Sequence, residues 1–237
     1  MKRISFLVAA VICTLLFASC RKVSGSGPIV TETRDISGFV EIKSEFSGDI
    51  FVTQGPTYRV AIESQQNIID VVETVLSNKT LTLRLKHHTS VRPKERIKVH
   101  ITVPEIEALV VSGSGNIEMM SHLVSDYLHL KIKGSGSINL NDVRATEVDA
   151  EISGSGEINI AGGEIHSEKI DISGSGDVYA ENLKASKADI KIAGSGDARV
   201  FVTDRLKVRI SGSGSVYYKG SPDVDINISG SGSVKRI

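Results

Sequence analysis

The chain has 237 residues, of which 28 are basic and 28 are acidic, so its formal net charge at pH 7 is zero. The sequence also lacks a basic stripe of the kind that nucleic acids or anionic membrane surfaces select. The chain contains no Trp and only 5% aromatic residues, which disfavours the aromatic-lined cleft of a sugar-processing enzyme.

The N-terminal segment has the pattern of an export signal. Lys2 and Arg3 precede a mostly apolar run of 14 residues, which is short for a membrane span. The sequence Leu-Phe-Ala-Ser-Cys that follows resembles a bacterial lipobox, which directs cleavage before its cysteine and acylation of that residue. We therefore predict a lipoprotein signal peptide over residues 1–19 and lipidation of Cys20, with an ordinary secretory signal as the alternative.

Residues 20–27 are rich in Gly and Ser and lack apolar alternation, so we expect a lipid-anchored tether there. No Asp follows Cys20, which by analogy with the usual bacterial rule agrees with sorting to the outer membrane. We expect the protein to be lipid-anchored in the cell envelope, facing either the periplasm or the cell surface.

Residues 28 to about 110 are predicted to form irregular β-coils. Alternating apolar residues predict strands near residues 39–43, 49–53, 58–63, 80–86 and 96–103. The apolar spacing over residues 67–76 allows one short helix. Residues 46–52 look like a degenerate version of the corners described next. We expect this half to continue into the repeats, with a separate small β-domain ending near Pro104 as the alternative.

Gly-Ser-Gly triplets recur through the second half of the chain. Their first glycines are Gly113, Gly134, Gly154, Gly174, Gly194, Gly212 and Gly230. A period of about 20 residues is typical of a solenoid, in which each repeat is one coil. Apolar residues alternate on both sides of each triplet, and the period places both glycines inside and the serine outside. We predict an all-β fold: a parallel β-helix or solenoid bent at Gly-Ser-Gly corners. It forms one domain over residues 28–237, with regular repeats over residues 105–237.

One outward position tests the register of these coils. From the second triplet on, the fifth residue before each triplet reads His129, Asp149, Lys169, Asp189, Lys207 and Asp225. Alternating charge is favourable if coils stack in parallel and in register about 4.8 Å apart. At the end of the chain Arg236 falls on the inward phase, where we expect its charge to discourage further stacking.

The sequence resembles the putative auto-transporter adhesin, head GIN domain family. Residues 39–52, the Val-Pro-Glu-Ile sequence at 103–106 and the Ile-Ser-Gly-Ser-Gly repeats at 152–156 and 172–176 carry the resemblance, which covers residues 33–237. It implies a secreted or lipid-anchored β-helical protein of the bacterial envelope. It supplies no catalytic residues.

Motifs that carry chemistry are few. The triplets match neither a phosphate-binding loop nor a nucleophile elbow, and no histidine has the spacing of a zinc site, so we expect no catalytic activity and no cofactor. Glu157, Asp177 and Asp197 occupy one outward position of successive repeats and should stack about 4.8 Å apart. This column predicts weak cation binding, with calcium as the candidate, and a solvated acidic strip is the alternative.

These observations favour a non-catalytic envelope lipoprotein that presents a rigid surface for adhesion or for binding a protein or glycan. Its partners would be the membrane, through lipidated Cys20, and an unidentified protein or glycan, but no nucleic acid. Tyr179 and Tyr217 are candidate contact residues. The alternatives are a polysaccharide-processing β-helix enzyme and a periplasmic scaffold or sensor.

Overall fold

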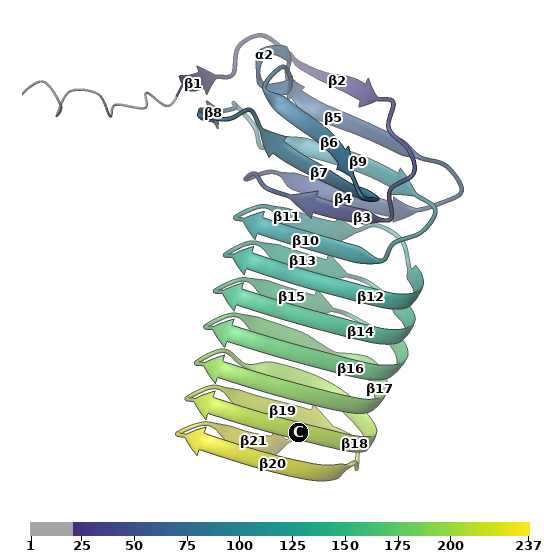
Figure 1. Ribbon diagram of the computed structural model, residues 1–237, viewed down its shortest axis with the longest axis vertical. Coiled ribbons are helices and arrows are strands. Elements are labelled where there is room, and N and C mark those ends of the chain that lie inside the picture. Colours follow the sequence, from purple (N-terminus) through teal and green to yellow (C-terminus); the bar gives the residue numbers. More distant parts are fainter. Residues whose placement is uncertain (1–20) are drawn as a thin grey trace, which may run out of the picture.

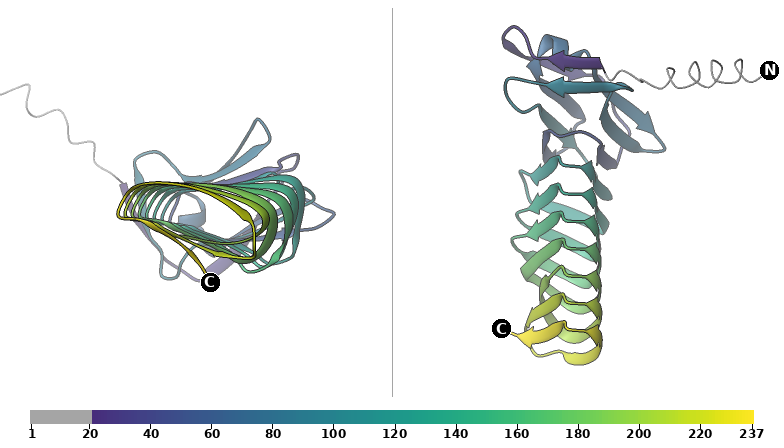
Figure 2. Two further views of the ribbon diagram at one scale, coloured as in Figure 1. Left: turned by 90° about the horizontal axis from the view of Figure 1, so that it is seen from below. Right: turned by 90° about the vertical axis from the view of Figure 1, so that its left-hand side faces the viewer.

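The computed structural model describes residues 21–237; the predicted signal peptide and Cys20 lie outside this range. The described chain is a stack of β-coils with an irregular region at one end (Figure 1). Seen along the stack, each coil is a flattened loop that is narrow at the Gly-Ser-Gly corners and broad at the opposite side (Figure 2). The predicted all-β solenoid is therefore confirmed. Within residues 21–237 no helix has the length and hydrophobicity that crossing a bilayer needs.

The irregular region contains nine strands and one short helix. They are β1 (Arg21–Ser24), β2 (Ile29–Arg34), β3 (Glu41–Ser44), β4 (Asp49–Gln54), β5 (Arg59–Gln65), α2 (Gln66–Ile69), β6 (Val72–Ser77), β7 (Thr80–Leu85), β8 (Thr89–Arg92) and β9 (Lys98–Val103). The sequence predicted β3, β4, β5, β7 and β9. It did not predict β2 and β8, which are largely polar.

The first coil lies inside the stack and not at its end. Strands β3 and β4 pair in parallel with β7 and β9 on one side, and with β10 (Ala108–Gly113) and β11 (Asn116–Met119) on the other. The chain then leaves this coil, builds β5–β9 above it and returns to begin β10. The antiparallel pairs β2–β5, β5–β9 and β6–β7 close that end of the core. We call residues 28–104 the cap.

Below the cap, each coil has a long strand before the Gly-Ser-Gly corner and a short strand after it. The remaining strands are β12 (Leu123–Gly134), β13 (Ser137–Leu140), β14 (Val143–Gly154), β15 (Glu157–Ile160), β16 (Gly163–Gly174), β17 (Asp177–Gly194), β18 (Ala198–Gly212), β19 (Ser215–Lys219), β20 (Asp223–Gly230) and β21 (Ser233–Arg236). All pair in parallel, and the first glycine of each triplet pairs with the first glycine of the next. Strands β17 and β18 each continue around the broad side of the coil, so each contributes residues to both faces.

The corners show why glycine recurs. Gly174 has φ of +126°, and a Cβ there would lie 2.4 Å from the carbonyl oxygen of Gly154 in the preceding coil. The Ser175 N–H donates a 2.9 Å hydrogen bond to the same oxygen, so the corners stack by direct backbone contact. All seven central serines are exposed, as the alternation predicted. A side chain at the first glycine would force the coils apart.

Two expectations for the cap need correction. The helix predicted near residues 67–76 is only the four-residue α2, and the second half of the segment forms β6, which pairs antiparallel with β7. Its β-branched residues suit a strand, and β7 supplies the hydrogen bonds that a helix would have made internally. The expected tether begins with β1, which pairs in parallel with β8 through contacts such as Val23 with Val91.

Candidate functional site

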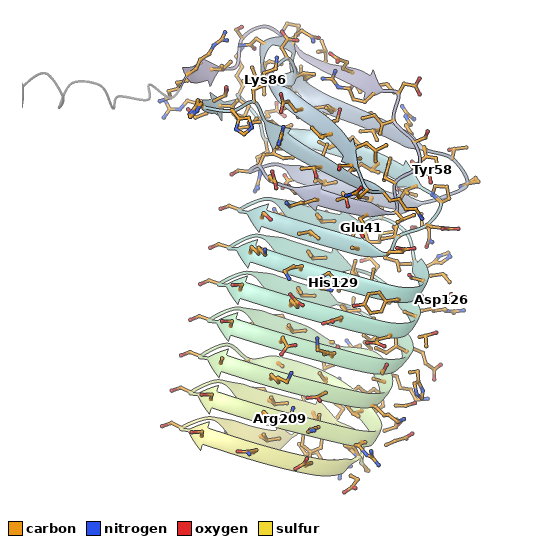
Figure 3. All side chains as sticks on the ribbon, in the orientation of Figure 1. Glu41, Tyr58, Lys86, Asp126, His129 and Arg209 are labelled. Atoms are coloured by element: carbon orange, nitrogen blue, oxygen red, sulfur yellow. The ribbon has the colours of Figure 1, made fainter. Side chains whose placement is uncertain are left out.

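The long strands form a regular outer face that we call the ladder face: the outward side of β12, β14, β16, β18, β20 and the second half of β17. The predicted column from His129 to Asp225 lies on it, with neighbours paired in register from coil to coil. A second column lies two residues further along each strand and includes Lys131 and Arg209. Figure 3 shows His129 and Arg209 toward opposite ends of this face.

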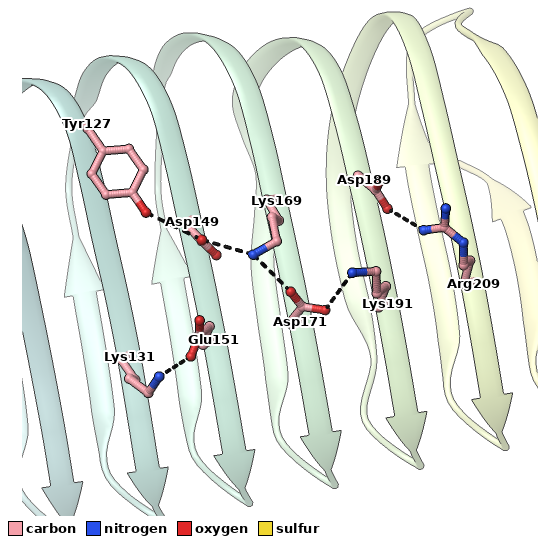
Figure 4. A network of polar contacts seen from close by, with 9 residues as sticks. All are labelled: Tyr127, Lys131, Asp149, Glu151, Lys169, Asp171, Asp189, Lys191 and Arg209. Atoms are coloured by element: carbon pink, nitrogen blue, oxygen red, sulfur yellow. Dashed lines mark hydrogen bonds and ion pairs between the residues drawn. The ribbon is translucent and has the colours of Figure 1, made fainter.

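Ion pairs cross between the two columns (Figure 4). The Lys169 Nζ lies 3.0 Å from Asp149 Oδ2 and 3.1 Å from Asp171 Oδ2, so one ammonium joins both columns. The Arg209 Nη1 donates to Asp189 Oδ1 at 3.1 Å. The alternating column suggested contacts along the column, but Asp189 is contacted diagonally by the longer Arg209. Lys131 pairs with Glu151 and Lys191 with Asp171.

The charges of the two columns balance. Together the columns contain five bases (Lys131, Lys169, Lys191, Lys207 and Arg209) and five acids (Asp149, Glu151, Asp171, Asp189 and Asp225). The hydrogen bond from Lys131 lowers the pKa of Glu151, and hydrogen bonds to Asp149 and Asp171 raise the pKa of Lys169. Both shifts keep the groups ionised near neutral pH. The ladder face therefore presents ordered charges without a strong net field.

A groove of about 620 Å³ follows the ladder face across six strands. The long side chains of the second column lie along the groove. The short side chains of the residues just before the triplets lie beside them, and residues such as Ile152 and Ile172 lie between the two sets. The short residues are Ser153, Ser173, Ala193, Ser211 and Ser229. The exposed surface of the groove is mostly apolar, and paired charges border it together with serine hydroxyl groups, whose series is interrupted at Ala193.

The predicted cation column lies on the opposite face, formed by the short strands. Glu157 is exposed and pairs in register with Asp177. Asp177 Oδ1 accepts the Asp197 N–H at 2.7 Å, and Asp197 Oδ1 accepts the Ser215 N–H at 2.7 Å. These two carboxylates therefore satisfy backbone donors just after the corner, which gives the acidic column a structural reason. Cation binding there stays a prediction.

The structure brings together a set of potential metal-ligating residues that differs from the predicted cation column. Among residues 21–237, potential metal-ligating atoms of His129, Asp149 and Glu151 lie within 4.8 Å of one another. Lys131 and Lys169 occupy this cluster as ion-pair partners of the two acids. The sequence reasoning treated His129 and Asp149 as a stacking column and did not connect them with Glu151, two residues beyond Asp149.

The two tyrosines named from the sequence share one cation. Arg199 Cζ lies 5.7 Å from the ring centroid of Tyr179 and 5.3 Å from that of Tyr217. Because the guanidinium lies over one face of each ring, the tyrosines stabilise the column and have less ring surface left for a sugar. The 20-residue period places Arg199 between them, but the sequence reasoning did not identify it.

One buried acidic residue, Glu168, was not identified from the sequence. Glu168 lies on the inward phase of β16, between Val148 and Ala188 of the neighbouring coils, and is 2% exposed. Neither carboxylate oxygen has a hydrogen-bond partner among the described residues, and burial raises the pKa of Glu168 to about 8. It is the sixth residue before its triplet, a position that the apolar pattern around the corners did not include.

Comparison with known proteins agrees with this architecture. Solved structures with the same fold include a putative adhesin from Bacteroides fragilis (TM-score 0.86, 24% identity, 91% of this chain and 100% of that one). They also include a putative lipid binding protein from Parabacteroides distasonis (TM-score 0.79, 26% identity, 92% of this chain and 100% of that one). A third is a putative adhesin from Parabacteroides merdae (TM-score 0.75, 24% identity, 92% of this chain and 99% of that one).

No curated protein matches the sequence. A family model does: it matches residues 38–222, which include the cap from β3 onward and all but the last coil. The repeated corners, the parallel register and the antiparallel cap thus belong to one family architecture, and the chain is a member of the putative auto-transporter adhesin, head GIN domain family.

Proposed function

We propose that this protein is a non-catalytic lipoprotein of the bacterial cell envelope, anchored to the outer membrane through lipidated Cys20. We further propose that its ladder face binds a protein or glycan partner. The observation that carries the binding proposal is the groove, which runs unbroken over six strands beside repeating hydroxyl and charged groups. Membership of an adhesin family supports the same conclusion. A related structure described as a putative lipid binding protein agrees with a binding role.

The repeat of the groove suits an extended partner. Serine hydroxyls both donate and accept hydrogen bonds. Ser153 and Ser173 lie on adjacent strands, as do Ser211 and Ser229, and Ala193 separates the two pairs. A polymer or an extended peptide with polar groups at regular intervals could contact several coils at once. Because the charges of the two columns are balanced and the exposed surface of the groove is mostly apolar, recognition would depend on apolar contact, hydrogen bonds and shape more than on long-range attraction.

Cleavage of a polysaccharide is less well supported than binding. Glycoside hydrolysis needs two accessible carboxyl groups, one of them protonated near neutral pH. Lys131 lowers the pKa of Glu151, so this acid would be ionised. Glu168 has a raised pKa but is buried in the core, where a sugar could not reach it. A binding surface therefore accounts for these residues better than a hydrolytic site.

The anchor and the location are tested in cells. Labelled fatty acid should be incorporated into the wild-type chain and lost from a Cys20→Ala variant. A non-penetrating protease applied to intact cells should remove the chain while a periplasmic control survives. If the chain survives until lysis, the adhesion role is wrong and a periplasmic scaffold or sensor takes its place.

Binding is tested with a matched pair of variants. Ser173→Lys and Ser211→Lys place long side chains in the groove, whereas Ser175→Lys and Ser213→Lys place the same side chains two residues later, on the exposed corner. The probes are an array of polysaccharides and a panel of immobilised matrix and bacterial surface proteins. Probes retained by the wild type should be lost by the groove variant and kept by the corner variant. Equal retention by both variants would exclude the groove as the site.

A further inference from the structure

We infer that the last coil is a docking edge for a second copy of this chain, so that two solenoids join end to end. In this dimer β20 of one protomer pairs antiparallel with β21 of its partner. The pairing goes beyond the proposed adhesion role, because it concerns the end of the stack and not its face.

The apolar core is uncovered at this edge. Strand β20 pairs with β18, and β21 pairs with β19, and no described residue lies along their other edges. Ile226 is 48% exposed and Ile228 is 37% exposed, whereas Val208 and Ile210, their partners in the preceding coil, are 0% and 3% exposed. The same inward columns that are buried along the stack therefore end in partly exposed side chains.

An open strand edge of this kind is suited to pairing with another strand. Unpaired backbone N–H and C=O groups beside exposed apolar side chains form a template for β-addition. At the other end of the stack the cap covers the same core, and Ile62 and Leu81 are fully buried. Because the core is open at only one described end, pairing of like edges closes after two copies and does not continue into a fibre.

Charge complementarity favours a second copy of this chain as the partner and favours the pairing of β20 with β21. The outward residues of β20 are acidic at its start, Asp223 and Asp225, whereas β21 carries Lys235. A twofold axis parallel to the strands places each β20 over the partner's β21. Outward Asp225 then lies opposite the partner's Lys235, and inward Ile226 lies opposite the partner's Val234. Pairing β20 with itself would offer no such attraction.

Arg236 does not block this contact. The sequence placed it on the inward phase, where a charge would stop stacking. In the structure it is exposed, and its Nη2 donates a 2.8 Å hydrogen bond to Ser221 Oγ beyond the end of β19. The guanidinium is therefore held beside the Ser221 hydroxyl. Arg236 adds a second positive charge near the strand that would face the partner's acidic residues.

The test uses the whole mature chain with Cys20→Ser, so that no lipid drives association. Sedimentation velocity over a wide range of concentrations should give twice the mass of one chain. Asp225→Lys and Lys235→Asp should each weaken dimerisation by about tenfold, because the twofold axis repeats every contact. The double variant with the charges exchanged should restore it.

Two controls separate the edge from general effects. Asp189→Lys makes the same charge change in the same outward column, two coils away from the edge, and should leave dimerisation unchanged. Ile226→Lys should abolish the dimer, while circular dichroism shows that the monomer remains folded. A chain that stays monomeric at all concentrations would overturn the inference. So would single charge variants that dimerise like the wild type, or a double variant that fails to recover.

Discussion

The two ends of this solenoid close their core in different ways. In the cap, antiparallel strands and a short helix cover the first coils, and Ile62 is completely buried. In the last coil Ile226 lies in an inward column that is buried in the coil before it, and it is 48% exposed. Within the stack each coil buries the apolar residues of its neighbours, so the repeat alone completes the core there. It cannot close an end, which needs either a different structure or a partner.

The largest effect is expected at a corner. Gly174→Ala would place a Cβ 2.4 Å from the Gly154 carbonyl oxygen at positive φ. We expect a loss of about 2–6 kcal/mol in the free energy of unfolding, from backbone strain and overpacking together. The matched control is Gly38→Ala in the cap, where φ is also positive but nothing lies within 4 Å. It should lose only about 1–2 kcal/mol, as measured by urea unfolding. Equal losses would mean that strain alone matters.

The next test compares the two ends directly. Ile62→Ala in the cap should cost about 2–5 kcal/mol, because it leaves a cavity in a fully buried region. Ile226→Ala should cost less than about 1 kcal/mol in the monomer, since much of the side chain already contacts solvent. Urea unfolding at low protein concentration measures both. A large loss for Ile226→Ala in the monomer would show that the end coil is packed more like the interior.

The repeats were predictable from the sequence because each coil meets a copy of itself. The triplets alone gave the corners, and the column containing Asp149 and Lys169 gave the register. The cap was harder, because the segment around Val72 has apolar spacing that suits a helix. Its strand conformation depends on β7, a partner that its own residues do not specify.

The candidate site was predicted only in part, for a similar reason. Position along the chain placed Asp177 and Asp197 in one column, but not the backbone N–H groups that their carboxylates accept. The diagonal pair of Arg209 with Asp189 depends on side-chain length and conformation after the coils have stacked. Register can be deduced from a repeat, whereas contacts between columns need the three-dimensional structure.

Glu168 makes the stability of the repeats depend on pH. Burial raises its pKa in the folded state from 4.5 to about 8, so the folded protein holds a proton that the unfolded chain releases. Stability should therefore fall as pH rises from about 4.5 to about 8 and then stop changing for this group. Glu168→Leu should remove this slope and gain about 3 kcal/mol at pH 7.

The control for this prediction is Glu164→Gln, an exposed carboxylate in the same strand. Thermal melts at pH 5, 7 and 8.5 should show that it keeps the wild-type pH dependence. A Glu168→Leu variant with an unchanged pH profile would mean that this carboxyl group is solvated in the folded protein.

The smallest effect is expected for the exposed ion pairs, which occur in both regions. Arg209 and Asp189 on the ladder face are 41% and 43% exposed, and Arg84 and Glu73 in the cap are 35% and 30% exposed. Double-mutant cycles with Arg→Gln, Asp→Asn and Glu→Gln should give coupling energies below about 1 kcal/mol for each pair, decreasing with added salt. A much larger coupling on the ladder face would mean that stacked charges reinforce one another along the solenoid. Similar small values would mean that apolar burial and backbone pairing hold the coils together, leaving the charged side chains available for a partner.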